Sequence, residues 1–175
     1  AWEKAASCNN IKALLRQGKN AKTPEEKKSY FKKAANLKSP EGILLYVNLL
    51  PQEEDEERKR VLDAGLLASN HNTLFSAQAT FELAQIKTRQ YEKMEDSDEN
   101  KSKTAKEIKT FLLHIIDLKP SDTELLKKTH QEIIKCLENE PKPIQNSSKK
   151  KLKHLFFHYK AAANYGDLAS AYRYG

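Results

Sequence analysis

A short pattern recurs three times along this chain: an aromatic residue is followed, three and four positions later, by two alanines. The copies are Trp2–Ala6, Phe31–Ala35 and Tyr159–Ala163. On a helix these three positions are neighbours on one face. The alanines let a second helix backbone approach closely, while the aromatic ring fills the adjoining gap. The pattern therefore predicts helices that pack against other helices.

Each copy leads through a short polar or turn segment into another apolar helix. These segments are residues 7–10, 36–39 and 164–167, and a fainter copy lies at 64–72. Successive copies are 29 and 33 residues apart, close to the period of helical repeats. We expect one helical-repeat domain over residues 1–175. Its degenerate repeats are expected at about 1–18, 24–50, 53–93, 103–139 and 148–175.

Apolar residues recur at helical spacing through the chain, and no stretch has the alternation of a half-buried strand. Thr23-Pro24, Ser39-Pro40 and Ser121 supply the N-caps and first-turn prolines that begin helices. The sequence therefore predicts an all-α fold. Helices are expected over 3–17, 24–37, 40–50, 53–69, 73–93, 103–118, 122–139, 148–164 and 167–174.

Composition excludes several classes of protein. The mean hydropathy is −0.79, and the sequence has no long apolar run, so no membrane span is expected. The two cysteines, Cys8 and Cys136, are too few for a disulfide scaffold. We expect each to be a small buried thiol. The chain is a charge-rich domain whose length suffices for a core of its own.

The last copy carries a family resemblance. Residues 159–175 resemble the core of a Sel-one-like repeat, a relative of the tetratricopeptide repeat, in which a Tyr-Lys-Lys-Ala-Ala helix leads through Gly-Asp to an Ala-x-Tyr-x-Leu-Gly helix. Where that family has glycine at the turn, this chain has Asn9, Lys38 and Asn70. The residues matching the signature are Ala5, Ala6, Ala34, Ala35, Ala162, Ala163, Gly166, Ala169 and Tyr172.

The resemblance implies an α-solenoid, a right-handed stack of antiparallel helix pairs. It also implies a non-catalytic scaffold or adaptor of a bacterial envelope, secretion or virulence-related assembly, in the periplasm or translocated rather than in the cytoplasm. The chain stops at Gly175, where a following helix of the family would cover the last one. We therefore expect a fragment of a longer solenoid, or self-association or another subunit at this end.

A stack of helix pairs presents a concave face that can hold a peptide or helix of a protein partner. On that face we expect Tyr30, Tyr46, Tyr91 and Phe157 to contribute. The alternative partner is a polyanion, nucleic acid or anionic glycan, since the net charge is +7. Its candidate residues are Lys149, Lys150, Lys151 and Lys153.

No enzyme, cofactor or metal is expected. The sequence lacks a glycine-rich phosphate loop, and the acidic run at 53–57 begins an expected helix, where capping explains it. His154 and His158 are four residues apart, but no third metal ligand is evident nearby. His71, His114 and His130 stand alone in the sequence and are interpreted as structural.

Overall fold

Capping side chains mark where the helices begin. The computed structural model describes residues 10–69, 72–95, 99–139 and 148–174. In six places a side-chain oxygen accepts a hydrogen bond from the backbone N–H three residues further on, which satisfies a donor that the first turn leaves unpaired. The caps are Asn10, Thr23, Ser39, Asn72, Asp122 and Asp167.

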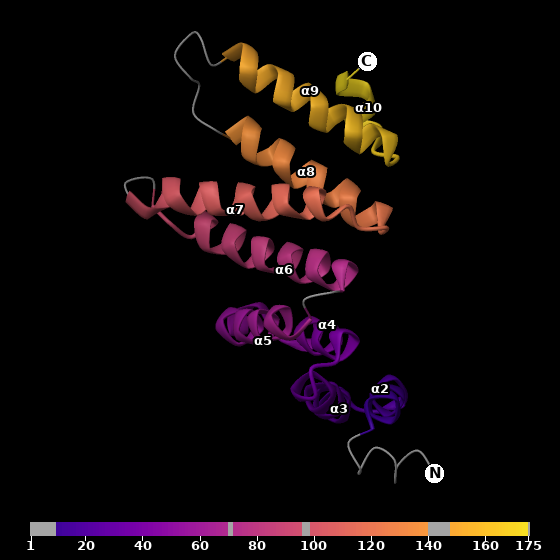
Figure 1. The fold of residues 1–175 in the computed structure, drawn as a ribbon. Coiled ribbons are helices and arrows are strands. Elements are labelled where there is room, and N and C mark those ends of the chain that lie inside the picture. Colours follow the sequence, from indigo (N-terminus) through magenta and orange to yellow (C-terminus); the bar gives the residue numbers. More distant parts are fainter. Residues whose placement is uncertain (1–9, 70–71, 96–98, 140–147, 175) are drawn as a thin grey trace. The chain divides into compact units, whose positions relative to one another are not determined.

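All elements of the described residues are helical (Figure 1). They are α2 (Ile11–Asn20), α3 (Pro24–Asn36), α4 (Pro40–Leu49), the short 3₁₀ helix η1 (Gln52–Glu54), α5 (Asp55–Ala68), α6 (Thr73–Glu92), α7 (Glu99–Leu118), α8 (Thr123–Asn139), α9 (Ser148–Asn164) and α10 (Leu168–Tyr174). The all-α prediction is confirmed. None of the described helices is both long enough and apolar enough to cross a membrane.

The expected bounds of two helices are wrong. The helix expected over 3–17 is not continuous through Asn10, which caps a helix that begins at Ile11 and continues to Asn20; residues 3–9 lie outside the described residues. That helix runs through Gly18 because the position packs on α3, where a Cβ would lie 2.4 Å from the Phe31 ring. The helix expected from residue 103 begins at Glu99. The other expected boundaries agree within two residues.

The chain divides into two units, residues 1–79 and residues 80–175, and the division falls within α6. The single domain expected over residues 1–175 depends on how the two units are arranged, and it stays a prediction. In unit 1, α3 packs on α2 and α4, and α4 packs on α5. In unit 2, α8 lies between α7 and α9, and α10 packs on α9 (Figure 1).

Glycines allow close helix contacts in unit 1. A Cβ at Gly42 of α4 would lie 2.7 Å from the Ala34 Cβ of α3, and one at Gly65 of α5 would lie 2.7 Å from Ile43 of α4. No side chain could enter these spaces without moving a neighbour. Gly42 therefore lets α4 pack closely on α3, and Gly65 lets α5 pack closely on α4.

The turn between α3 and α4 is a Schellman motif. The Lys38 N–H donates to the Ala35 carbonyl at 2.9 Å, and the Ser39 N–H donates to the Ala34 carbonyl at 3.2 Å. Lys38 itself is in the left-handed region, with φ of 60°. That conformation favours glycine, so the lysine is strained there.

The turn between α9 and α10 repeats this geometry. The Gly166 N–H donates to Ala163 at 2.9 Å, and the Asp167 N–H donates to Ala162 at 3.0 Å. Gly166 has φ of 86° and occupies the position of Lys38. Two copies of the sequence pattern thus form the same helix–turn–helix unit, one in each unit of the chain.

Candidate protein-binding surface on α9 and α10

Exposed apolar side chains concentrate near the end of unit 2. Seven of the twelve exposed large hydrophobic residues in the described part of the chain lie within residues 148–174. We call this set the α9–α10 surface. Its members are Leu152, Phe156, Phe157, Tyr165, Leu168, Tyr172 and Tyr174. Scattered exposed hydrophobic residues are normal, whereas large contiguous patches of them are typical of interaction sites.

The outer face of α10 is the most exposed part of this surface. Leu168 is 84% exposed and Tyr172 is 90% exposed, and their four-residue spacing places them on one helix face. The inner face carries Ser170, which is 3% exposed. The Ser170 N–H and hydroxyl both donate to the Asp167 carboxylate. These bonds lower the pKa of Asp167, against an opposing effect of burial.

Along α9 the surface continues as a second apolar stripe. Leu152 is 53% exposed and Phe156 is 43% exposed, again four residues apart. Lys160 follows one turn later, and its Nζ lies 5.8 Å from the centre of the Tyr174 ring on α10. The stripe therefore runs up to the last residue of α10.

A polar network holds α10 in place. The Tyr159 hydroxyl of α9 donates to Glu138 of α8. Arg173 of α10 donates to the same Glu138 oxygen at 2.5 Å and to the Tyr159 hydroxyl oxygen at 2.9 Å. Burial, followed by the bond to Glu138, raises the pKa of Tyr159. Three helices thus converge on one carboxylate.

Two buried histidines lie beneath one edge of the surface. The Nδ1 atoms of His130 on α8 and His158 on α9 are 2.8 Å apart, so one ring must donate and the other accept. Burial lowers both pKa values. For His158, burial and then the neighbouring His130, His154 and Lys109 lower the pKa to about 4.

This histidine pair supports two exposed rings. The ring centre of Phe157 lies 6.2 Å from that of His130, and Tyr165 stacks on His130 at 5.9 Å. Phe157 and Tyr165 thus have a fixed base, since the ring they contact is itself buried and hydrogen-bonded. Exposed aromatic rings in fixed positions are suited to binding, because little side-chain freedom is lost on contact.

The surface lies within a basic segment. Residues 148–174 contain five lysines and one arginine but a single acidic residue, Asp167. Lys153 and Lys160 are exposed, and Lys151 is half-buried. Of the four lysines predicted for polyanion binding, the side chains of Lys149 and Lys150 lie outside the described part.

The four predicted partner-binding aromatics have different environments. Tyr46 is 3% exposed, and burial raises its pKa, so it belongs to the core of unit 1 and not to an exposed groove. Tyr30 and Tyr91 are half-buried, with Lys33 and Lys101 over their rings at 5.9 and 5.2 Å. Phe157 is 60% exposed and is the one of the four on the α9–α10 surface.

The residues matching the repeat signature also divide by burial. Ala34, Ala35 and Ala162 are buried, whereas Ala163 is half-buried. Ala169 and Tyr172 differ from the expected packing role because both are exposed, α10 facing α9 through Ser170 instead. Ala5 and Ala6 lie outside the described residues, as do Cys8, Asn9, Asn70 and His71.

His154 and His158, four residues apart on α9, have different environments. His154 is exposed, whereas His158 turns inward to His130, which the sequence had left standing alone. Within the described ranges, no group of three or more His, Cys, Asp or Glu side chains could hold a metal ion. Cys136, expected to be buried, is half-buried.

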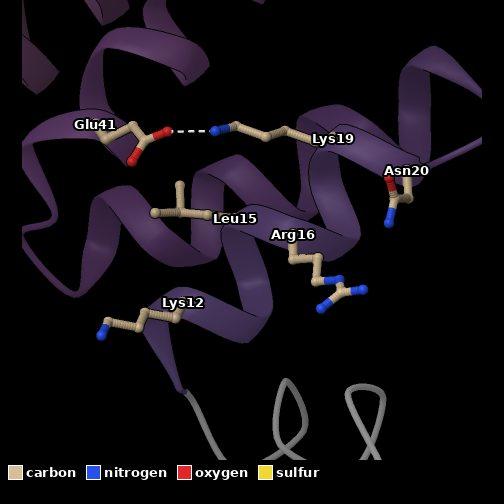
Figure 2. A pocket seen from close by; sticks show the side chains of 6 residues that line it. All are labelled: Lys12, Leu15, Arg16, Lys19, Asn20 and Glu41. Carbon is tan, nitrogen blue, oxygen red and sulfur yellow. Dashed lines mark hydrogen bonds and ion pairs between the residues drawn. The ribbon is translucent and has the colours of Figure 1, made fainter.

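Unit 1 carries a separate polar hollow between α2 and α4 (Figure 2). Its lining residues are Lys12, Leu15, Arg16, Lys19, Asn20 and Glu41. The Lys19 Nζ and Glu41 Oε1 are 2.6 Å apart, so the one carboxylate of the lining already binds one of its cations. The hollow is open and basic.

Comparison of the chain with protein-family models, with curated proteins and with solved structures gives no significant match. The function is therefore proposed from the structure of the chain itself.

Proposed function

We propose that this chain is a non-catalytic protein-interaction scaffold that binds a protein partner through the α9–α10 surface. The concentration of exposed aromatic and aliphatic side chains on α9 and α10 carries the proposal. Exposed patches of this kind mark protein-binding surfaces. The Schellman turns shared by the two helix pairs support repeated units, and we propose that these stack as an α-solenoid.

The Sel-one-like resemblance supports the proposed setting. We place the scaffold in a bacterial envelope, secretion or virulence-related assembly, in the periplasm or translocated. That setting would bring the surface to other proteins of the same assembly. Because apolar contacts carry the proposed interaction, we expect the partner to stay bound at high salt.

The test is affinity capture from the source cell at high salt with three forms of the chain. The wild type is compared with the double variant Leu168→Ser with Tyr172→Ser. Leu67→Ser is the matched control, since Leu67 is 81% exposed but lies on α5 in unit 1. A partner captured by the wild type and the control, and lost with the double variant, supports the proposal. Equal capture by all three contradicts it.

Polyanion binding is the second candidate function, favoured by the basic hollow of unit 1 and the lysines of α9. A polyanion complex weakens steeply with salt because bound counterions are released. The variant combining Lys149→Glu, Lys151→Glu and Lys153→Glu should abolish it if α9 is the site. Binding that survives both the triple variant and high salt excludes this mode at α9.

A further inference from the structure

Two buried histidine rings meet where α9 packs on α8. His130 is 3% exposed and His158 is 5% exposed, and their Nδ1 atoms are 2.8 Å apart. For this contact to form, one Nδ1 must carry a hydrogen and the other must offer a lone pair. The contact therefore lasts only while no more than one of the two Nδ1 atoms is protonated.

Protons can enter this pair in two steps. The donor ring of the neutral pair has its lone pair on Nε2, so a first proton can bind there without breaking the contact between the rings. A second proton must go to the accepting Nδ1, and two N–H groups would then face each other across 2.8 Å. Both rings can therefore be charged only when they separate.

The surroundings of the pair oppose even the first charge. Burial, followed by repulsion from His130, His154 of α9 and Lys109 of α7, lowers the pKa of His158 to about 4, and burial lowers the pKa of His130. A separated, solvated ring has its ordinary pKa of about 6.5. The separated state thus binds more protons than the packed state, and acid favours it.

The carboxylates of the neighbouring elements are bound to other groups. Asp167, the cap of α10, accepts a hydrogen bond from Gln131 and faces Lys127, both on α8. Glu138 of α8 accepts from Arg173 of α10. Among the described residues, no carboxylate pairs with either histidine ring, so a positive charge on the pair is not compensated.

A small apolar cluster joins α8 and α9 beside the histidines. It consists of Ile134 on α8 with Tyr159 and Ala162 on α9, and Leu155 packs against it. Ile134 and Ala162 each lie one helical turn beyond the histidine of the same helix. Separation of the rings therefore pulls on the apolar contact that holds α9 against α8. Because α10 packs on α9, the two helices would leave together.

We infer that the pair of His130 and His158 is an acid-sensitive joint, at which uptake of two protons separates α9 and α10 from α8 while α7 and α8 stay packed. Local openings of contiguous helices are a common form of partial unfolding. The opening also alters the α9–α10 surface, because Phe157 and Tyr165 lose the His130 ring that they contact. The joint itself needs no partner.

The test is native-state hydrogen exchange of the full chain at pH 7, 6 and 5, with rates corrected for the intrinsic effect of pH. Between pH 6 and pH 5 the opening constant of α9 and α10 should rise roughly tenfold for each histidine that takes up a proton. This opening should also depend less on urea than the opening of α7, because it exposes less surface. Equal protection and equal urea dependence of α7 and α9 at pH 5 overturn the inference.

Two variants assign the response to the pair. His130→Leu with His158→Leu replaces both rings, so none is left unpaired, and it should abolish the pH response of α9 and α10. His114→Gln is the matched control, since His114 is an exposed histidine of α7 in the same unit, and it should keep the response. A response that persists in the double variant overturns the inference.

Histidine titration of the wild type by NMR covers the case in which the double variant does not fold. His130 and His158 should titrate below His114 and in step with the loss of protection in α9. Rings that become charged while α9 stays protected overturn the inference.

A third variant separates the histidines from the other acid-sensitive link between these helices, the bond of Glu138 to Arg173. Glu138→Gln should leave the response between pH 6 and pH 5 in place. Loss of the response in this variant overturns the inference in favour of the carboxylate. None of these measurements involves a partner, so a negative result leaves the proposed scaffold function as it was.

Discussion

The α3–α4 and α9–α10 pairs have the same turn but opposite surroundings. In the first pair the outer helix is buried beneath α5, and Ile43 and Tyr46 are core residues. In the second pair Ala171 and Tyr174, which have the same positions after the N-cap as Ile43 and Tyr46, are exposed. The shared turn sets the angle between two helices, whereas the residues beyond it decide whether the pair becomes core or surface. The same local structure is therefore covered by a further helix in one unit and exposed in the other.

The largest expected difference between the two pairs concerns side-chain truncation. Ile43→Ala should lower the free energy of unfolding of unit 1 by about 2–5 kcal/mol, because it leaves a cavity at a residue that is 1% exposed. Tyr172→Ala on α10 should change stability by no more than about 0.5 kcal/mol. Urea unfolding, with hydrogen exchange to assign each effect to a unit, measures both. Similar losses at the two sites would remove the contrast.

A smaller effect should separate the units by pH. His158 has a folded pKa of about 4, against about 6.5 when unfolded, so between these values the unfolded state binds more protons. Its contribution to stability is full above pH 6.5 and declines as the pH falls toward 4. We expect unit 2 to lose about 2 kcal/mol between pH 7 and pH 5.

The control for this prediction replaces both rings. Combining His130→Leu with His158→Leu removes the titrating groups without leaving one unpaired, and should flatten the pH dependence. Amides of α3 and α4 in unit 1 serve as an internal reference in the same exchange experiment. A wild-type profile that is flat between pH 7 and pH 5 would contradict the buried pair.

Exchanging the left-handed residues tests whether the turns are equivalent. Gly166→Lys should destabilise unit 2 by about 1–2 kcal/mol, because it places a side chain at φ of 86°. Lys38→Gly should stabilise unit 1 by up to about 1 kcal/mol through relief of the same strain. Thermal unfolding of each variant gives the sign. Changes of the same sign would show that the two turns differ.

The N-caps should show the smallest difference. Ser39→Ala and Asp167→Ala should each cost about 0.5–1 kcal/mol near neutral pH, since each removes one cap. Hydrogen bonds from Ser170 lower the folded pKa of Asp167, so its contribution is present above the unfolded pKa and is lost as the pH falls through the folded value. The Ser39 cap should not respond, and acid titration of both variants measures the contrast.

Local signals predicted most of the fold. Thr23 and Ser39 cap helices where the sequence predicts it, Asp122 caps α8 in place of the predicted Ser121, and the paired alanines mark two equivalent turns. The strain at Lys38 was less accessible from sequence, because only the position of glycine in the equivalent turn reveals it. Helix starts and turns depend on a few adjacent residues, and such residues can be recognised in sequence.

The candidate surface depended on longer-range facts. Tyr46 and Tyr174 share a position after their caps, yet one is buried and the other exposed. The difference lies in α5, outside either pair. The contact between His130 and His158 joins residues 28 positions apart on different helices, so the spacing of His154 and His158 could not indicate it. Leu168 and Tyr172 lie four residues apart in the sequence, but that spacing does not show that both are exposed.

The order of helix contacts bears on how the chain is made. Within each unit the helices that pack together follow one another in sequence: α2 on α3, α3 on α4, α4 on α5, and likewise α7 through α10. Chains dominated by such local contacts fold quickly, because little loop entropy is lost before a contact forms. Each helix finds its packing partner in the helix synthesised just before it. The nascent chain can therefore acquire structure helix by helix as it leaves the ribosome.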